Sequence, residues 1–425
     1  MSHNLIVGAG TIGAGVLGVA FQSVLSHQMH PSDYGAVFAV VTLITLVGLP
    51  ATAFTLLMAR ETSRGLASGQ LALSSTTLSQ GSSALIYAGL VVAAVLATAS
   101  RPLGSYLGVQ PALLLAAAAG LPFGVALPLF IGEFQGEQRF GLYSVFGVGQ
   151  AALKLVAAIG LGLVLGPLGV ILGISLATAA VYLLARVILR RKLALRPTMH
   201  WLGPAARYLA VIVPSTLALS VLLSADVFVV KHYFPTRIAG EYAAVAALGR
   251  AVFWGASAVA TVLFPKVVFR GTKGLGRSQL VNASLLIVVV GGGLALGMVL
   301  FASTPILAAF AGPAYAAGAT YLPWYAVGMT LLGGVAVLIA VHQSRGKPGF
   351  LLLLLPLMVA EPIALVAFHG SLWQVVQVVD VSMALLFFAL AALYVVEERF
   401  FGPTHAAGQV GVTALQVIGR VGADR

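Results

Sequence analysis

The sequence predicts an all-α protein that crosses a membrane about twelve times, with its helices grouped in two six-helix bundles. Three observations predict this fold class. Hydrophobic residues make up 60% of the chain and charged residues only 8%, whereas charged residues are about a quarter of a soluble domain. Apolar runs of about 20 residues, the length that crosses the hydrocarbon core of a bilayer, recur along the whole chain. One short sequence pattern also occurs twice, once in each half of the chain.

The first half contains six predicted spans. A polar loop with a proline joins the first two, and Gly166-Pro167, a pair typical of tight turns, separates the last two. The spans are expected at about residues 5–25, 35–58, 78–99, 111–132, 142–165 and 167–189. A basic connector follows them, so we expect the N-terminal bundle to cover residues 1–196.

The second half repeats this organisation. Its spans are expected at about residues 208–230, 240–264, 280–302, 320–342, 349–369 and 373–396. We therefore expect a C-terminal bundle over residues 197–398 and a cytoplasmic tail over residues 399–425. Because six spans return the chain to the side on which it started, the halves are predicted to be parallel repeats about a pseudo-two-fold axis along the membrane normal.

The pattern that occurs twice is an acidic residue, a tyrosine, a small residue, an alanine and a valine. It reads DYGAV at residues 33–37 and EYAAV at residues 241–245. Each copy follows an apolar helix and a proline-containing loop, and each opens another helix. The chain therefore resembles one module used twice.

The basic residues are distributed unequally between the two predicted sides of the membrane. Three of them (Arg101, Lys231 and Arg237) fall on one side, and Lys154 and Arg250 fall within spans. Eighteen fall on the other side: Arg60, Arg64, Arg139, Arg186, Arg190, Arg191, Lys192, Arg196, Arg207, Lys266, Arg270, Lys273, Arg277, Arg345, Lys347, Arg399, Arg420 and Arg425. Lysine and arginine accumulate in cytoplasmic loops, so both termini are expected in the cytoplasm. The excess of basic residues behind the net charge of +12 is explained by these cytoplasmic loops, so the net charge does not indicate a nucleic-acid partner.

Motifs for catalysis or cofactor binding are not supported. Residues 8–13, GAGTIG, match the dinucleotide pattern GxGxxG, but that pattern needs a βαβ unit. Small residues inside an apolar span indicate close helix packing instead. No phosphate-binding P-loop is encoded, the chain has no cysteine, and nothing near His27 and His30 completes a metal site. We therefore expect no enzyme activity, no cofactor and no metal.

Five ionisable residues fall inside predicted spans, where a charge costs about 2.5–3.5 kcal/mol on insertion scales. Lys154, Arg250 and Glu361 are expected near mid-depth, and Asp226 and Asp380 nearer the outer third. One interpretation is that they line a water-filled path and bind a charged substrate or a coupling ion. The alternative is internal ion pairing that fixes helices together, for example between Lys154 and an acid across the bundle. Intramembrane charge favours the first interpretation. Lys231, near a span end, is expected to extend toward the interface.

Hydroxyl side chains form a weaker pattern. Thr42, Thr45, Thr52 and Thr55 share one face of the second predicted span. Such a stripe suits a polar lumen for sugar hydroxyls, although hydroxyls in helices often bond to a carbonyl one turn earlier. Both interpretations stay open at this stage.

Three segments of the chain resemble a known family. Residues 25–40 (LSHQMHPSDYGAVFAV) resemble the segment that leaves the first helix of bacterial polysaccharide flippases. Residues 132–144 (GEFQGEQRFGLYS) resemble their segment after helix four, and residues 224–250 (SADVFVVKHYFPTRIAGEYAAVAALGR) resemble their helices seven and eight. The similarity follows the family's order over nearly the whole chain. This polysaccharide-transporter family belongs to the multidrug/oligosaccharidyl-lipid/polysaccharide (MOP) superfamily, which also contains multidrug extruders and a peptidoglycan lipid flippase with two further helices.

The resemblance implies a MOP fold in the bacterial inner membrane. It also implies translocation of an undecaprenyl-pyrophosphate-linked oligosaccharide to the outer leaflet by alternating access. Partners implied are membrane lipids, a glycan polymerase and glycosyltransferases. By position, the resemblance implies that Asp226 and Arg250 contact the substrate and that Arg60 and Arg64 lie at the cytoplasmic mouth. The other intramembrane charges, Lys154, Glu361 and Asp380, are expected in the same cavity, and Arg139 is expected at the mouth.

The charge of the predicted cavity departs from the family's pattern. Family cavities tend to be cationic, whereas the intramembrane set here has two bases and three acids. A strongly acidic glycan is therefore disfavoured. Coupling to H⁺ or Na⁺ would use one of the acids, Asp226, Glu361 or Asp380, and the sequence does not select among them.

Two other functions stay open. One is a cation-coupled exporter of small amphipathic drugs, in which the acids form the coupling site. Drug export that Asp226→Asn abolishes while the surface glycan is unchanged would support it. The other is a non-transporting membrane scaffold of a glycan-synthesis complex, for which Arg250→Ala would leave glycan export intact.

Overall fold

The fold was obtained as a computed structural model, which describes residues 2–68, 71–193, 202–272, 278–345 and 348–401. Every regular element in these ranges is a helix, which confirms the predicted all-α class. The first half contains α1 (Ser2–Gln28), α2 (Pro31–Ala51), α3 (Ala53–Ser68), α4 (Leu71–Thr98), α5 (Ser100–Leu107), α6 (Pro111–Gly136), α7 (Phe140–Ile188) and α8 (Arg190–Leu193). The second half contains α9 (Leu202–Leu222), α10 (Ala225–Tyr233), α11 (Thr236–Thr272), α12 (Ser278–Ala311), η1 (Pro313–Thr320), α13 (Leu322–Arg345), η2 (Pro348–Phe350), α14 (Leu351–Ala367) and α15 (Leu372–Phe401).

Ten of the described helical segments are long and apolar enough to cross a membrane. One of them, α7, contains two of the predicted spans, and the predicted span at 240–264 lies within α11. A helix is therefore present for each of the twelve predicted spans. The chain is a multi-pass membrane protein.

Turn residues explain several helix boundaries. Pro31 and Pro111 open α2 and α6, where the missing amide of proline removes a hydrogen-bond donor that would have no helical partner. Gly108 ends α5 in the left-handed conformation, with φ of 59°, which glycine adopts without steric cost. The second predicted span is divided into α2 and α3 just after Pro50, because proline disrupts the hydrogen-bond ladder of a helix.

The long helix α7 is a hairpin of two antiparallel arms. At Gly166 the backbone has φ of 59° and ψ of −141°, which is not helical, and glycine permits this geometry. A Cβ placed on Gly169 would lie 2.0 Å from the carbonyl oxygen of Leu161, and one on Gly173 would lie 2.5 Å from that of Ala157. The two arms therefore pack backbone against backbone, as the predicted turn at Gly166-Pro167 requires.

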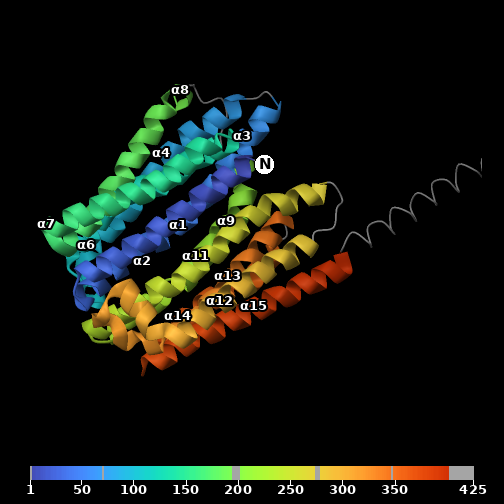
Figure 1. The fold of residues 1–425 in the computed structure, drawn as a ribbon. Helices are drawn as coiled ribbons and strands as arrows, with labels where there is room; N and C mark the ends of the chain where they lie inside the picture. The colour runs from blue at the N-terminus through green and yellow to red at the C-terminus, as the bar shows by residue number, and fades with distance from the viewer. Residues whose placement is uncertain (1, 69–70, 194–201, 273–277, 346–347, 402–425) are drawn as a thin grey trace, which may run out of the picture.

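The helices form two groups that lie side by side (Figure 1). The helices coloured blue to green make one group and those coloured yellow to red make the other, with α1 and α2 facing α9 and α11 between them. The start of α1, helix α8 and the end of α15 lie at the same end of the molecule, which faces the top and the right of Figure 1. We call this the basic end, because the predicted orientation places most basic residues there, and we call the opposite end the distal end. The predicted bundle boundary at 196/197 and most of the predicted tail (402–425) lie outside the described residues.

The two copies of the repeated pattern lie against each other at the distal end. A Cβ placed on Gly35 would lie 2.9 Å from the Cα of Gly240, and one on Gly240 would lie 1.8 Å from the carbonyl oxygen of Pro31. Glycine is required at both positions for α2 and α11 to approach this closely. Equivalent segments of two repeats meet in this way when the repeats face each other across a two-fold axis.

Further contacts join the two groups at the distal end. The Ser23 hydroxyl donates to the carbonyl oxygen of Phe310 at 2.6 Å. The rings of Tyr106 on α5 and His232 on α10 stack with centroids 3.7 Å apart, and the His232 Nδ1–H donates to the Tyr106 carbonyl oxygen at 2.7 Å. The distal end is therefore closed in this conformation.

Two glycines bring α6 and α3 into contact near the basic end. A Cβ on Gly132 would lie 2.4 Å from the carbonyl oxygen of Thr55, and one on Gly136 would lie 2.5 Å from the Thr62 Cβ. The small-xxx-small spacing of the GEFQG segment thus serves helix packing. Gly10 plays the same part on α1, where a Cβ would lie 2.6 Å from the Cβ of Ser144 on α7. The GAGTIG segment thus packs closely against α7 at Gly10, as the small residues in this span predicted.

We expect Gly132→Ala to lower the free energy of unfolding by about 1–3 kcal/mol, because the added methyl group forces α6 away from α3. Thermal unfolding of the purified protein in detergent measures the effect. Gly141→Ala is the matched control, since a Cβ there meets no atom within 4 Å, and we expect it to be neutral or slightly stabilising. Equal melting temperatures for the two variants would contradict the packing argument.

Candidate functional site

The described intramembrane charges centre on an ion pair between Arg250 on α11 and Asp226 on α10. The Arg250 Nη2 lies 3.0 Å from Asp226 Oδ1. Both residues are buried, with 7% and 1% of their surface exposed. A pair removed from water to this extent needs further hydrogen bonds to satisfy its remaining polar atoms.

Four neighbours supply those interactions. Tyr242 and Tyr325 each donate a hydrogen bond of 2.8 Å to Asp226 Oδ2. The Arg250 Nη1 donates to Thr42 Oγ1 at 3.2 Å, and its guanidinium lies 5.2 Å from the centre of the Phe38 ring. Thr42 and Phe38 belong to α2, whereas Arg250 belongs to α11. The cluster therefore joins the two groups of helices near their centre.

This arrangement matches the ion-pairing alternative for Asp226 and Arg250 in the present conformation. Tyr242 belongs to the repeated pattern, but it lies 16 residues from Asp226 along the chain. The sequence gave no sign that its hydroxyl reaches that carboxylate. Tyr325 and Thr42 come from distant parts of the chain, and no sequence signal linked them to the pair.

The other two acids lie on neighbouring helices. Glu361 on α14 is completely buried, and neither carboxylate oxygen has a hydrogen-bond partner among the described residues. Its carboxyl group interacts electrostatically with Asp226 and Arg250, so it belongs to the same polar region. Asp380 on α15 lies apart from this region, where its Oδ1 faces Gly328 of α13: a Cβ on that glycine would lie 2.5 Å from it.

The two lysines lie elsewhere. The ammonium of Lys154 on α7 lies 4.6 Å from the ring centre of Phe21 on α1, and no ion pair joins it to a described carboxylate. Lys231 on α10 does not extend outward as expected. It is 5% exposed, and its charge interacts with that of Asp33 at the start of α2. The structure therefore brings Arg250, Asp226 and Glu361 together and leaves Lys154 and Asp380 apart.

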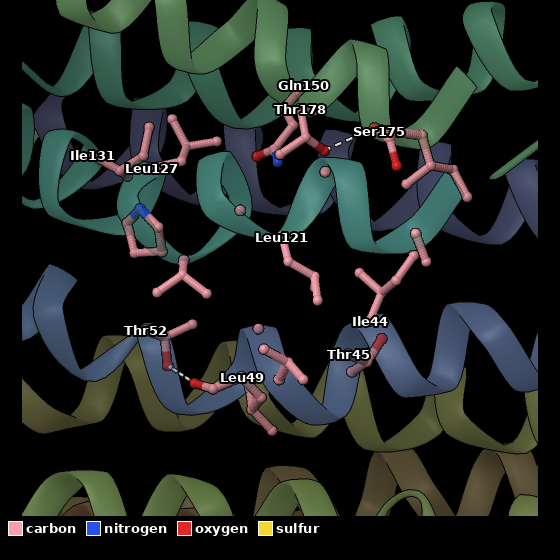
Figure 2. Close-up of a pocket in the computed structure, with 18 of the residues that line it drawn as sticks. Ile44, Thr45, Leu49, Thr52, Leu121, Leu127, Ile131, Gln150, Ser175 and Thr178 are labelled. Carbon is pink, nitrogen blue, oxygen red and sulfur yellow. Dashed lines mark hydrogen bonds between the residues drawn. The ribbon is translucent and has the colours of Figure 1, made fainter. Parts of the chain in front are cut away.

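A cavity of about 430 Å³ lies on the basic side of this cluster. Residues of α2, α3, α6 and α7 line it (Figure 2), and Trp254 of α11 also contributes to the lining. Trp254 and Thr45 each lie one helical turn beyond a cluster residue, Arg250 and Thr42 respectively. Residues three or four apart share a helix face, so the charged cluster lies next to the cavity on its distal side.

The lining consists of apolar side chains interrupted by hydroxyls and one amide. Of the threonine stripe predicted on the second span, Thr45, Thr52 and Thr55 line the cavity, whereas Thr42 contacts Arg250. Ser175, Thr178 and Gln150 of α7 face them from the opposite wall (Figure 2). The sequence analysis did not select the α7 residues. Both arms of the α7 hairpin are predominantly apolar, so the sequence does not show which face of each arm points into the cavity.

Close helix packing places these α7 hydroxyls at the cavity. A Cβ on Gly120 of α6 would lie 2.6 Å from Ser175 Oγ, and one on Gly124 would lie 3.7 Å from Thr178 Cγ2. The glycines thus leave room for the α7 hydroxyls between the two helices. The cavity wall depends on α6 carrying small residues at this face.

The three arginines predicted at the mouth lie at the basic end, outside the cavity lining. The Arg60 guanidinium lies 4.7 Å from the ring centre of Tyr208 on α9, so it bridges the two groups of helices there. Arg64 and Arg139 are exposed and form ion pairs of 3.5 Å with Glu61 and Glu137. Long ion pairs of exposed arginine side chains contribute little stability.

A second buried polar site near the basic end was not predicted. Glu133, between the two packing glycines of α6, is completely buried and accepts hydrogen bonds from Thr62 and from Lys192 of α8. Lys192 also lies 2.5 Å from Glu137. The spacing of Glu133 and Glu137 along one helix face was the signal that could have indicated a shared partner.

Lys192 is held in its charged form by these two acids. Burial lowers the pKa of its ammonium, but the hydrogen bonds and charges of Glu133 and Glu137 raise the pKa further, to a net value above the usual 10.5. A lysine whose pKa is raised by folding stabilises the protein below its unfolded pKa, and this contribution is lost as the pH rises through the folded pKa.

We therefore expect the wild-type protein to lose stability above about pH 10.5 more steeply than Lys192→Met. Melting temperatures measured in detergent from about pH 8 to about pH 12 test this. Because other lysines and tyrosines titrate equally in both proteins, only the difference between the two curves reports Lys192. Parallel curves would show that the interaction does not contribute.

No group of three or more histidine, aspartate or glutamate side chains within the described residues is placed to hold a metal ion. The Asp226–Arg250 cluster and the cavity are thus the two features around which a function must be built.

Comparison with solved structures identifies the fold. The chain is similar to the inward-facing conformation of a multidrug resistance MATE family transporter of the MOP superfamily, with a TM-score of 0.73 and 14% identity over 91% of this chain and 96% of that one. It is similar to the eukaryotic MATE transporter AtDTX14, with a TM-score of 0.71 and 13% identity over 96% and 97% of the chains. It is also similar to the lipid II flippase MurJ in an inward closed conformation, with a TM-score of 0.66 and 13% identity over 92% and 87%.

These comparisons define an α-helical membrane protein with the fold shared by MATE transporters and MurJ. No protein-family profile matches the chain, and no curated protein is significantly similar to it in sequence. The MOP fold predicted from the three resembling segments is confirmed at the level of the fold.

Proposed function

We propose that this protein is a transporter that moves an undecaprenyl-pyrophosphate-linked oligosaccharide from the inner to the outer leaflet of a bacterial inner membrane. The observation that carries the proposal is the cavity in the first group of helices, bordered by Trp254 of the second, whose wall combines hydroxyls with apolar surface. Pockets of roughly 300–1,000 Å³ with a few convergent polar groups are typical of binding sites for small ligands. A cavity of about 430 Å³ suits part of an oligosaccharide.

The basic end supplies a place for the pyrophosphate. Arg60, Arg64 and Arg139 lie there, and an arginine fork matches the geometry of phosphate oxygens. The polyprenyl chain stays in the membrane while the sugars enter the cavity. Transport then consists of closing the basic end and opening the distal end, by rocking of the two halves.

The membrane potential favours this direction. An anion that moves outward from a cell that is negative inside gains about 2.3 kcal/mol per charge for each 100 mV. A pyrophosphate headgroup therefore moves downhill without a nucleotide. Transport in this direction therefore does not require nucleotide hydrolysis.

Reconstitution tests the proposal directly. Purified protein in liposomes should move a fluorescent polyprenyl-pyrophosphate disaccharide between leaflets, measured by an impermeant quencher, faster than protein-free liposomes do. The double variant Arg60→Ala/Arg64→Ala should slow movement, whereas Arg101→Ala, a matched exposed arginine on α5 at the distal end, should not. No movement above that in empty liposomes, with protein that elutes as a single folded species, would refute the proposal.

One observation favours a second candidate, a cation-coupled exporter of amphipathic drugs. Glu361 is buried without a hydrogen-bond partner among the described residues, and a buried carboxylate needs a counter-charge, which a coupled cation would supply. Dye efflux driven by a proton or sodium gradient, and abolished by Glu361→Gln, would support this function. Dye efflux that is independent of both the proton and the sodium gradient would exclude a cation-coupled exporter.

A further inference from the structure

Resting on the proposed function, we infer that the cavity accepts an uncharged, hydroxyl-rich sugar and excludes acidic sugars. The inference concerns which glycans pass, and it is drawn from the hydrogen-bonding state of the lining. It therefore adds a substrate class to the site already described.

The hydroxyl groups of the lining already donate their protons to the protein backbone. The Thr45 hydroxyl donates to Val41 O at 3.0 Å, and the Thr178 hydroxyl to Ile174 O at 2.8 Å. Figure 2 draws the latter bond, together with the 2.6 Å bond from Thr52 to Leu49 O. Each hydroxyl has one proton and two lone pairs. What remains for a ligand is therefore the acceptor side of each oxygen.

Two further hydroxyls are engaged in the same way across helices. The Thr55 hydroxyl donates to Pro128 O at 2.9 Å, and the Ser175 hydroxyl donates to Ala116 O at 2.7 Å. These bonds hold neighbouring helices together, so turning the hydroxyls toward a ligand would leave a carbonyl unsatisfied, at a cost of roughly 1–3 kcal/mol. The N–H donors of the lining come from the side chains of Gln150 and Trp254.

A wall made mostly of acceptors distinguishes sugars by charge. Sugar hydroxyls are donors and can meet these oxygens. A carboxylate accepts only, so in the same place it would face oxygens that also only accept. None of the described lysines, arginines or histidines lines the cavity to compensate such a charge, and an uncompensated buried charge is strongly disfavoured.

The cation next to Trp254 does not change this conclusion. Arg250 lies one helical turn from Trp254, but its guanidinium donates to Asp226, Thr42 and Tyr325. Its charge is balanced by Asp226 at 3.0 Å. The pair thus presents no free positive group to the cavity. The carbon face of a sugar ring, in contrast, can pack on the indole of Trp254, which is 45% exposed.

The test compares two matched probes in the reconstituted system. Both are fluorescent polyprenyl-pyrophosphate disaccharides, one ending in glucose and the other in glucuronic acid. We expect the neutral probe to move at least about tenfold faster, and the methyl ester of the acidic probe to recover most of that rate. Equal or faster movement of the acidic probe overturns the inference while the proposed function stands. If neither probe moves, the proposed function fails, and the inference that rests on it falls too.

Variants of one lining residue complete the test. Thr178→Lys should increase movement of the acidic probe relative to the neutral one by about tenfold, because it places a cation in the wall. Thr178→Val keeps the shape, removes the acceptor and should slow the neutral probe. Thr98→Val on α4 is the control, since its hydroxyl makes the same bond to a carbonyl one turn earlier, at 2.9 Å, but is exposed away from the cavity. An unchanged ratio in Thr178→Lys, with folding verified by the melting temperature, overturns the inference.

Discussion

Asp226→Ala is expected to be one of the most destabilising single substitutions in this protein. The substitution leaves the Arg250 guanidinium buried without its counter-charge at 3.0 Å. It also removes the acceptor of the Tyr242 and Tyr325 hydroxyls. Breaking a buried pair by removing one partner costs about 3–5 kcal/mol, a large part of the stability of a typical protein. Thermal unfolding in detergent should show a large fall in melting temperature.

Two further variants separate the pair from its surroundings. The double variant Asp226→Ala/Arg250→Met should be more stable than Asp226→Ala alone, because it removes the uncompensated charge. Arg237→Ala is the control. Arg237 also pairs with a carboxylate, that of Glu241, but its side chain is 71% exposed, and exposed ion pairs contribute about 0–1 kcal/mol to stability. A double variant no more stable than the single one would show that the ion pair is not what stabilises this region.

The sequence predicted the helices well and their mutual arrangement only in part. Apolar runs and turn residues were sufficient to place a helix at each predicted span, since a segment in lipid must satisfy its own backbone. The turn at Gly166 and the close packing of the GAGTIG segment followed from local chemistry in the same way. The division of the second span at Thr52 was not predicted, although Pro50 supplied the reason for it.

The candidate site was less predictable because it depends on contacts between distant residues. Asp226 and Arg250 were both selected as intramembrane charges, but 24 residues separate them along the chain, and their pairing depends on how α10 meets α11. The sequence equally allowed Lys154 to be the partner of an acid. Only the fold shows that Lys154 lies over the ring of Phe21 on α1.

The cavity lining illustrates the same limit. The threonine stripe of α2 was visible from its helical spacing, and both interpretations of it apply, because Thr45 and Thr52 line the cavity while their hydroxyls bond to the backbone. Which helix faces this stripe could not be read from local sequence. The answer, α7, depends on the glycines of α6 that let Ser175 approach.

The second large effect is expected from a cross-link at the distal end. The stacked rings of Tyr106 and His232, with centroids 3.7 Å apart, join α5 of the first half to α10 of the second. If the two halves must separate there to release the substrate, then joining these positions with a short thiol-reactive reagent in Tyr106→Cys/His232→Cys should reduce transport by more than about tenfold. Cleavage of the linker by a reductant should restore it. The chain has no cysteine of its own, so the reagent has no other target.

The chain offers a matched control for this cross-link. Tyr233 and His369 also stack with centroids 3.7 Å apart at the distal end, but both belong to the second half. Rocking of rigid halves changes distances between the halves and preserves those within each. Tyr233→Cys/His369→Cys should therefore transport normally after cross-linking. Full transport with the 106–232 link complete would mean that the distal end need not open, and transport by alternating access would then be excluded. Loss of transport with both links would instead point to a local effect of the reagent, so only the difference between the two pairs supports movement of one half against the other.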